Sequence, residues 1–217
     1  MIERLLPDVV ACAETREDVV DVELFAEEEA SVGRAVDKRR REFIAGRACA
    51  RLALGRLGIA PVAIPNGPRG EPRWPPGVVG SITHCAGYRA CAVARSADVA
   101  TVGIDAEPNA PLPAGVLEEV ASGPEREFIA SARAGDRELD LGRLVFSAKE
   151  SVYKAWFPLT QRWLGFMDAE LSLDLAAATF RARLLVPGPR VRGEAVTEFH
   201  GRWAVEARIV CTAVVVP

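Results

Sequence analysis

The sequence predicts an α+β fold made of two pseudo-symmetric halves, with a functional site in the cleft between them. Residues 1–104 are expected to form the N-terminal half and residues 105–217 the C-terminal half, packed closely as one unit. Two observations predict this fold. A helical pattern followed by short β-branched runs occurs twice along the chain. With 217 residues, 49% of them hydrophobic, the chain can also bury a substantial core.

The first half is predicted to contain a helical region, a loop and three strands. Residues 25–57 have apolar side chains near helical spacing, which predicts a helix interrupted near Gly33 and ended by Gly58. Residues 61–77 are dense in proline and glycine and predict a rigid, irregular loop. The β-branched runs at 78–84, 88–95 and 99–107 predict adjacent strands, the first two forming a hairpin.

The second half repeats this order after a proline-containing connection at 108–124. Helical patterns cover residues 124–134 and 139–158. Further strands are predicted for AELSLD, TFRARLLV, EAVTEF and RWAVEARIVCTAVVV, the last nearly all apolar on one face. Inside the second helical pattern, Ser147 and Glu150 match the S-x-x-E capping box, which predicts a helix start there. Glu150 and Lys154 match a stabilising i, i+4 ion pair.

A local internal sequence similarity supports the division into two related halves. FIAGRACARLAL at 43–54 aligns without gaps with FSAKESVYKAWF at 146–157. The alignment places Phe43 on Phe146, Ala45 on Ala148, Arg47 on Glu150 and Arg51 on Lys154. Self-similarity of this kind is typical of a repeated unit. It suggests that charged positions of two equivalent helices meet at a cleft.

Composition excludes several classes of function. A net charge of −3 argues against general nucleic-acid binding, because the phosphate backbone is bound mainly by an excess of lysine and arginine. The N-terminal stretch MIERLLPDVV contains no long apolar run, so we expect neither a signal peptide nor a membrane span, and a cytoplasmic location.

Cysteine and histidine usage limits the kind of metal site. The five cysteines are scattered and lack C-x-x-C spacing, so we expect reduced, mostly buried thiols rather than disulfides or a zinc site. The only histidines are His84 and His200, which excludes a multi-histidine centre. Any metal would therefore be held by carboxylates, whose oxygen atoms favour magnesium, manganese or calcium.

Two carboxylates stand at the end of a predicted buried strand, in TVGIDAEP. Because a strand alternates its faces, Asp105 and Glu107 would project from the same side, ~6 to 7 Å apart. Glu150 could supply a third oxygen ligand for Mg²⁺, and Lys154, one helical turn further on, would face the same cleft. A cation beside a metal suits an anionic phosphate substrate. The alternative is an exposed strand end with two solvated acids.

Basic residues of the first half could complete a phosphate site. A stripe of arginines is predicted on its helix, namely Arg39, Arg40, Arg41, Arg47 and Arg51. Such a run is also typical of a solvated helix face. Arg69 and Arg73 lie in the proline-rich loop. His84 follows a strand, where it could donate to phosphate or serve as a structural hydrogen-bonding residue.

Four motifs in this order resemble the 4'-phosphopantetheinyl transferase superfamily, in its surfactin-activating and enterobactin-synthase-associated branch. They are GRACARLAL, RGEPRWPPGVVGSITHC, VGIDAE and FSAKESVYKAWFPLT, and the resemblance covers the chain from about residue 40 to 165. The second and fourth are most similar to actinobacterial-type members that activate polyketide and nonribosomal peptide synthases. The resemblance implies the pseudo-dimeric α+β fold of this superfamily with coenzyme A between the halves. It also implies transfer of the phosphopantetheine arm to a carrier-protein serine, releasing adenosine 3',5'-bisphosphate.

The resemblance also implies roles for individual residues. Asp105, Glu107 and Glu150 would hold Mg²⁺, or Mn²⁺, on the pyrophosphate. Asp105, Glu150 and Lys154 would be catalytic, with Glu150 as the general base, directly or through a magnesium-bound water, and Lys154 on the pyrophosphate. The residues expected to bind coenzyme A are Arg40, Arg47, Arg69, Thr83, His84, Asp105 and Lys154. Where several relatives have a lysine before the motif proline this chain has Glu71, so Arg69 or Arg73 would supply that charge.

The expected partners are coenzyme A and apo acyl or peptidyl carrier domains of polyketide, nonribosomal peptide or siderophore assembly, docking near residues 110–125. Neither nucleic acid nor membrane is an expected partner. A monomer is expected because the internal duplication supplies both walls of the cleft. Two other functions stay open on the sequence: a non-catalytic carrier-protein or coenzyme A binding module, and a magnesium-dependent nucleotide phosphohydrolase, which would release inorganic phosphate.

Overall fold

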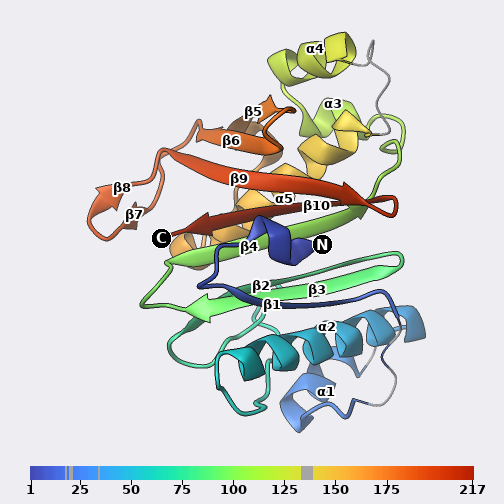
Figure 1. Ribbon diagram of the computed structural model, residues 1–217, viewed down its shortest axis with the longest axis vertical. Coiled ribbons are helices and arrows are strands. Elements are labelled where there is room, and N and C mark those ends of the chain that lie inside the picture. Colours follow the sequence, from blue (N-terminus) through green and yellow to red (C-terminus); the bar gives the residue numbers. More distant parts are fainter. Residues whose placement is uncertain (18, 20–21, 34, 133–138) are drawn as a thin grey trace.

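The computed structural model describes residues 1–17, 19, 22–33, 35–132 and 139–217 (Figure 1). Groups of helices and groups of strands follow one another along the chain in an α+β arrangement. In order they are η1 (Ile2–Leu5), β1 (Ala11–Thr15), α1 (Ala26–Val32), α2 (Asp37–Arg56), β2 (Val78–Cys85), β3 (Tyr88–Arg95), β4 (Thr101–Pro108), α3 (Val116–Val120), α4 (Gly123–Ala132), α5 (Leu141–Thr160), η2 (Phe166–Asp168), β5 (Ala169–Asp174), β6 (Thr179–Leu184), β7 (Arg190–Val191), β8 (Glu194–Ala195), β9 (Glu198–Glu206) and β10 (Ile209–Val216).

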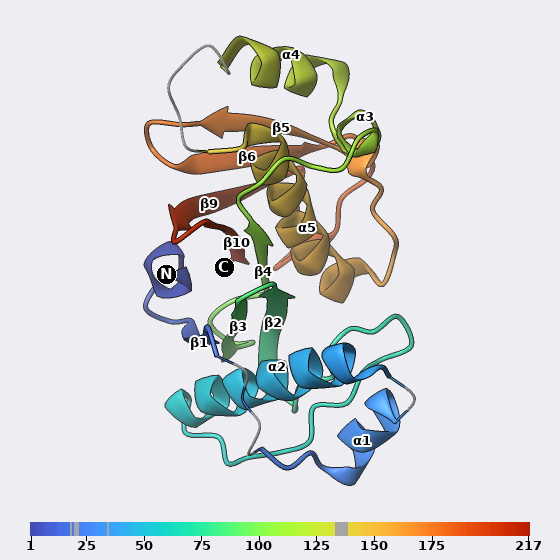
Figure 2. The same cartoon turned by 90° about the vertical axis from the view of Figure 1, so that its right-hand side faces the viewer.

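Two antiparallel sheets form the two halves. The first has the strand order β1-β3-β2 and the second the order β4-β10-β9-β6-β5, while β7 and β8 form a separate small hairpin. Figure 2 shows α2 lying against the first sheet and α5 against the second, so each half has one long helix on one sheet. The predicted division at 104/105 cuts β4, all of whose residues pair with β10. A division between β3 and β4 keeps that strand whole.

Most predicted elements are confirmed. The helical region breaks between α1 and α2, and Gly58, with a φ of 73°, follows the end of α2. The strands β2 and β3 form the predicted hairpin. The prediction of one long strand over 202–216 is wrong, because the chain turns at Ala207 and Arg208, both with positive φ, and divides into β9 and β10.

The capping box predicted at Ser147 and Glu150 is also wrong. Helix α5 begins two turns earlier, where the Asp140 side chain accepts a hydrogen bond of 2.8 Å from the Arg143 amide. Ser147 lies inside the helix, with its hydroxyl 3.1 Å from the Thr212 hydroxyl of β10. An S-x-x-E capping box does form at the start of α4, where the Ser122 amide donates to the Glu125 carboxylate at 2.6 Å and the Glu125 amide donates back to the Ser122 hydroxyl at 3.4 Å.

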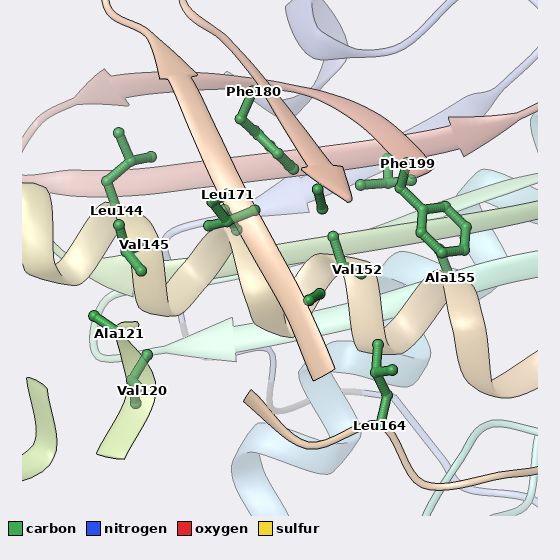
Figure 3. Packing of buried hydrophobic residues seen from close by; sticks show 14 of the residues in the cluster. Val120, Ala121, Leu144, Val145, Val152, Ala155, Leu164, Leu171, Phe180 and Phe199 are labelled. Carbon is green, nitrogen blue, oxygen red and sulfur yellow. The ribbon is translucent and has the colours of Figure 1, made fainter. Parts of the chain in front are cut away.

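Helix α5 is fixed on the second sheet by an apolar face and by a very close contact with β4. Figure 3 shows its side chains Val145 and Val152 within a cluster that includes Leu171 and Phe199 of the sheet. At Gly103 of β4 an added Cβ would lie 2.0 Å from the Ser151 carbonyl oxygen and 2.6 Å from the Ala155 amide nitrogen. Only glycine therefore lets α5 approach the strand that carries Asp105.

Replacing Gly103 with alanine is expected to destabilise the fold by about 1–3 kcal/mol or more, because the added methyl group meets backbone atoms that cannot move aside alone. It should also lower activity, since α5 must shift relative to β4. Gly55→Ala is the matched control, because nothing lies within 4 Å of its added Cβ. Chemical denaturation of both variants tests this; equal stability of the two would contradict the packing argument.

The edges of the two sheets meet along a seam between β2 and β4. Two hydroxyl groups of β2 bridge it: the Ile104 amide donates to the Ser81 hydroxyl at 3.1 Å, and the Ala106 amide donates to the Thr83 hydroxyl at 2.9 Å. In addition, apolar residues of η1, β3, β4 and β10 form one core that is shared by the two halves. The two halves are therefore packed as a single unit, and Asp105 lies between the two β4 residues that are bonded across the seam.

Candidate active site

The predicted site residues gather in a cavity of about 310 Å³ where α2, β2, β4 and α5 meet. The cavity wall includes Arg39 and Arg47 from α2, Thr83 and His84 from β2, Asp105 and Glu107 from β4, and Glu150 and Lys154 from α5. Two pairs of residues that align between the halves line it, namely Phe43 with Phe146 and Arg47 with Glu150. Charged positions of the two long helices therefore do meet at a cleft. A larger cavity of about 650 Å³, along β5, β6, β9 and β10, contains none of the predicted residues.

Asp105 is the buried centre of the cavity. Its side chain is 6% exposed, and its Oδ1 accepts a hydrogen bond of 2.7 Å from the Lys154 ammonium and one of 3.4 Å from the Thr83 hydroxyl. Its Oδ2 is buried without a hydrogen-bond partner in the described chain. Because Lys154 pairs with Asp105, the ion pair predicted between Glu150 and Lys154 is wrong. An unpartnered buried carboxylate oxygen is costly unless a ligand satisfies it.

Glu107 and Glu150 are destabilised as anions. Burial raises the pKa of Glu107 to about 7, with a further contribution from the negative charge of Asp105. The Arg143 guanidinium opposes this rise in the pKa of Glu107, donating to its Oε2 at 3.0 Å. Burial also raises the pKa of Glu150, and Asp105 adds to the rise while Lys154 opposes it. Burial is therefore the main reason why the charged forms of Glu107 and Glu150 are disfavoured.

The carboxylate oxygens of these acids are suitable ligands for a hard cation. In this arrangement, however, the three side chains do not form a complete metal site. Within the described ranges, no group of three or more His, Cys, Asp or Glu side chains could hold a metal ion as the chain is arranged here. The bare Oδ2 of Asp105 and the raised pKa values of Glu107 and Glu150 nevertheless fit a divalent cation with oxygen ligands. The residues therefore fit magnesium in donor type.

Glu150 occupies the junction of three cavities. Besides the central one, it lines a second cavity of about 430 Å³ between the proline-rich loop and the end of α5, and a third of about 70 Å³ beside Trp163 and Phe166. Tyr153, one helical turn beyond Glu150 on α5, lines both of these neighbours. Glu150 is therefore the residue that lines all three cavities.

His84 forms a small charged cluster with two residues of α2. The Arg39 guanidinium donates to His84 Nε2 at 2.6 Å, and His84 Nδ1 lies 3.7 Å from the Glu42 carboxylate. Burial lowers the pKa of His84, and the positive charge of Arg39 lowers it further. The imidazole is therefore neutral near pH 7, with its proton on Nδ1. Sequence reasoning placed Arg39 in the arginine stripe but not among the site residues.

The other arginines of the stripe have partners inside the first half. Arg47 is buried, donates to the Ile64 carbonyl and to the Asn66 side chain, each at 2.6 Å, and stacks on Phe43. Burial lowers its pKa to about 10. Arg40 pairs with Glu29 and does not line the central cavity. Arg51 pairs with the fully buried Glu28 and is also absent from the cavity wall. Two members of the stripe, Arg40 and Arg51, thus form ion pairs that join α1 to α2.

Arg69 and Arg73 line the neighbouring cavity rather than the central one. The Arg69 guanidinium lies over the Phe157 ring, 5.8 Å from its centroid. The Glu71 side chain accepts a hydrogen bond of 2.9 Å from the Arg69 amide, so Glu71 stabilises a turn within the loop. Both arginines therefore bring positive charge to the wall of that cavity.

Comparison with known proteins agrees with this geometry. Residues 27–94 match the 4'-phosphopantetheinyl transferase N-terminal domain model and residues 101–205 match the model of the 4'-phosphopantetheinyl transferase superfamily. 4'-Phosphopantetheinyl transferase Svp of Streptomyces mobaraensis is 53% identical over 100% of this chain and 89% of its own length. The chain belongs to the 4'-phosphopantetheinyl transferase superfamily.

Other members of the superfamily align along nearly the whole chain. Npt of Nocardia iowensis is 49% identical over 99% of both proteins, and PptT of Mycobacterium tuberculosis is 44% identical over 99% of this chain and 97% of its own length. Enterobactin synthase component D of Salmonella typhi matches less, at 35% over 55% of this chain and 49% of its own. The two superfamily models meet between residues 94 and 101, at the turn from β3 to β4. No helix of the described ranges has the length and apolar character needed to span a membrane.

Proposed function

We propose that this member of the superfamily transfers the 4'-phosphopantetheine arm of coenzyme A to a serine of an apo acyl or peptidyl carrier protein, with release of adenosine 3',5'-bisphosphate. The observation that carries the proposal is the position of Glu150, at the meeting point of three cavities and beside the Asp105–Lys154 ion pair. Relatives that align over the full chain are named as transferases of this kind. The carriers would serve polyketide, nonribosomal peptide or siderophore assembly.

The reaction requires a base, and the proposal gives this role to Glu150. The carrier serine oxygen would form a bond to the β-phosphorus, while the bond from that phosphorus to the leaving bisphosphate oxygen breaks. The serine proton would pass to the Glu150 carboxylate. Lys154 would lie beside the pyrophosphate and stabilise the negative charge that develops on the leaving group.

Asp105, Glu107 and Glu150 would hold the metal, Mg²⁺ or Mn²⁺. When bound, the ion would neutralise the pyrophosphate charge and the mutual repulsion of the three acids. Arg143 would keep Glu107 oriented from its other side, through its 3.0 Å hydrogen bond. It also donates to the Ala110 and Pro111 carbonyls at 3.0 Å each, which fixes the segment after β4.

Coenzyme A phosphates would bind at the α2 and β2 side of the cavity. His84 with Arg39 would receive one of them, and Arg47 would lie near the adenosine 3'-phosphate end. The predicted contributions of Arg40 and Arg69 would require them to act from outside the central cavity. One chain supplies both walls of the cleft, which supports action as a monomer, and the segment near 110–125 remains the proposed carrier docking region.

Coenzyme A binding near pH 7 is expected to take up protons. The pKa of His84 lies below its usual value in the free protein, so the imidazole is neutral. A phosphate placed beside it would raise that pKa through neutral pH and draw a proton from solvent. Calorimetry in buffers of different ionisation enthalpy measures the uptake. His84→Gln should reduce it; unchanged uptake in that variant would assign the proton to another group.

The proposed function is tested by product analysis. The protein, coenzyme A, Mg²⁺ and an apo carrier should yield adenosine 3',5'-bisphosphate in step with carrier modification. Omitting the carrier should stop the release. Release of inorganic phosphate without a carrier would instead support a nucleotide phosphohydrolase, and coenzyme A binding without any product would support a non-catalytic module.

A further inference from the structure

Part of the proline-rich loop, residues 64–73, forms walls of two of the cavities at Glu150. Asn66, Gly70 and Pro72 line the central cavity, and Gly70 and Pro72 also line the neighbouring cavity of about 430 Å³. The two arms of the loop are joined, because Asn66 and Pro72 form an isolated antiparallel bridge. The place where the first arm is held therefore also determines where the second arm lies.

The first arm of this loop is held at Ile64, a buried residue, through both of its backbone groups. The Ile64 amide donates to Glu28 Oε1 of α1 at 2.8 Å. The Ile64 carbonyl accepts from the Arg47 guanidinium of α2 at 2.6 Å, and Arg47 also donates to the Asn66 side chain. Two helices, α1 and α2, therefore fix the start of the loop.

Glu28 is a fully buried acid that has no part in the proposed reaction, and it lines none of the cavities at Glu150. Figures 1 and 2 show α1 beyond α2, on the side away from the second half. Besides the Ile64 amide, the Glu28 carboxylate accepts from the Phe25 amide at 3.0 Å and from the Arg51 guanidinium. Burying a carboxylate is costly, and these three donors from separate segments offset that cost.

We propose that Glu28 is a positioning residue for the coenzyme A site, acting through the Ile64 amide on the loop at 64–73. A loop that is already fixed at its start loses little further freedom when a ligand enters the cavity, so the ligand binds more tightly. Glu28 lies away from the reacting atoms, and its effect is therefore on binding rather than on the chemical step. The inference rests on the proposed function for the identity of the ligand, whereas the contacts of the loop do not depend on it.

Arg51→Met and the double variant Glu28→Leu with Arg51→Met form a matched pair. Both lack the ion pair between α1 and α2, and only the double variant lacks the acceptor for the Ile64 amide. Their melting temperatures should be similar, because the double variant removes an unpaired buried charge but leaves the Ile64 and Phe25 amides without an acceptor. A difference in the loop between the two variants is then due to the acceptor.

Hydrogen–deuterium exchange of the free protein and calorimetric titration with coenzyme A, both without carrier, test the inference. Exchange in a peptide covering 64–73 should be about 10-fold or more faster in the double variant than in Arg51→Met. Coenzyme A should bind the double variant about 10-fold or more weakly, while Arg51→Met stays within about 2-fold of the unmodified protein. In carrier modification by the double variant, KM for coenzyme A should rise by the same factor and kcat should stay within about 2-fold.

Glu14→Gln is the control for a general loss of stability. Glu14 of β1 also accepts from a backbone amide, that of Ile2, and from the Tyr88 hydroxyl, and it lies outside the cavities at Glu150. The variant should lower the melting temperature and leave the coenzyme A affinity unchanged. If it weakened binding as much as the double variant does, lost stability would explain both results and the inference would be overturned.

The outcomes separate this inference from the proposed function. Equal exchange of the 64–73 peptide in the matched pair would overturn the role of Glu28 in holding the loop. Faster exchange in the double variant with unchanged coenzyme A affinity would overturn the role in the site and leave Glu28 a structural residue of the first half. If the unmodified protein does not modify a carrier, the proposed function fails, and the exchange comparison still decides whether Glu28 holds the loop.

Discussion

Replacing Glu150 with glutamine is expected to lower kcat by about 10²–10⁴-fold, the range that a general base contributes, while the fold remains intact. The substitution keeps the size and polarity of the side chain but removes its ability to take the serine proton. It also removes one carboxylate from the proposed metal set. Glu150 is half-buried with a raised pKa, so glutamine relieves rather than creates a buried charge, and stability should not fall.

The measurement for Glu150→Gln is initial-rate kinetics of carrier modification, with thermal melting as the check on folding. Glu27→Gln is the matched control, because Glu27 is exposed on α1 and outside the cavities at Glu150. It should leave the rate unchanged. A rate for Glu150→Gln within a few-fold of the unmodified protein would remove Glu150 from the role of base.

Replacing Lys149 with methionine should destabilise the protein by about 3–5 kcal/mol, because it leaves a buried carboxylate without its counter-ion. The Lys149 ammonium, whose side chain is 3% exposed, donates to the Glu125 carboxylate and to the Val120 and Phe166 carbonyls, each at 2.8 Å. Glu125 in turn accepts from the Leu171 amide at 2.7 Å. The lysine thus joins α3, α4, η2 and β5 to α5, directly beside Glu150.

Chemical denaturation of Lys149→Met tests this prediction. The double variant Lys149→Met with Glu125→Gln should be more stable than Lys149→Met alone, since it removes the unpaired charge. Lys38→Met is the control at an exposed position of α2 and should change stability by less than about 0.5 kcal/mol. A loss below about 1 kcal/mol in Lys149→Met would show that the buried pair contributes little.

The order of helices and strands could be predicted because it follows from local patterns. The apolar spacing of α2 and α5 and the β-branched runs of β2 to β4 each identify their element without tertiary information. The ends of the helices and strands were harder to predict from the sequence. The S-x-x-E pattern occurs at both Ser122 and Ser147, and only the first starts a helix, because tertiary packing continues α5 back to Asp140.

The acids of the site were predictable from alternation and helical spacing, but their partners were not. Which oxygen Lys154 approaches depends on how closely α5 rests on Gly103, and no local pattern encodes that approach. Arg143 was not predicted as a site residue, although it lies two turns before Glu150 on the same helix and donates to Glu107. Helical spacing of seven residues from a predicted site acid was a usable signal.

The first half shows why charge runs are hard to interpret. The arginine run at the start of α2 predicts one basic face, yet its members have different partners: Arg39 contacts His84, and Arg40 and Arg51 form ion pairs with α1. Burial in the folded chain, rather than the sequence of charges, determines which of them faces the cavity.

Intact-mass spectrometry of a purified apo carrier protein, incubated with this protein, coenzyme A and Mg²⁺, tests the central claim most directly. The proposed function predicts a mass gain of one phosphopantetheine arm on the carrier serine, absent when EDTA is added and absent from a carrier whose serine is replaced by alanine. No gain on fatty-acid, polyketide or peptide carriers, under conditions where the protein is folded and binds coenzyme A, would contradict it.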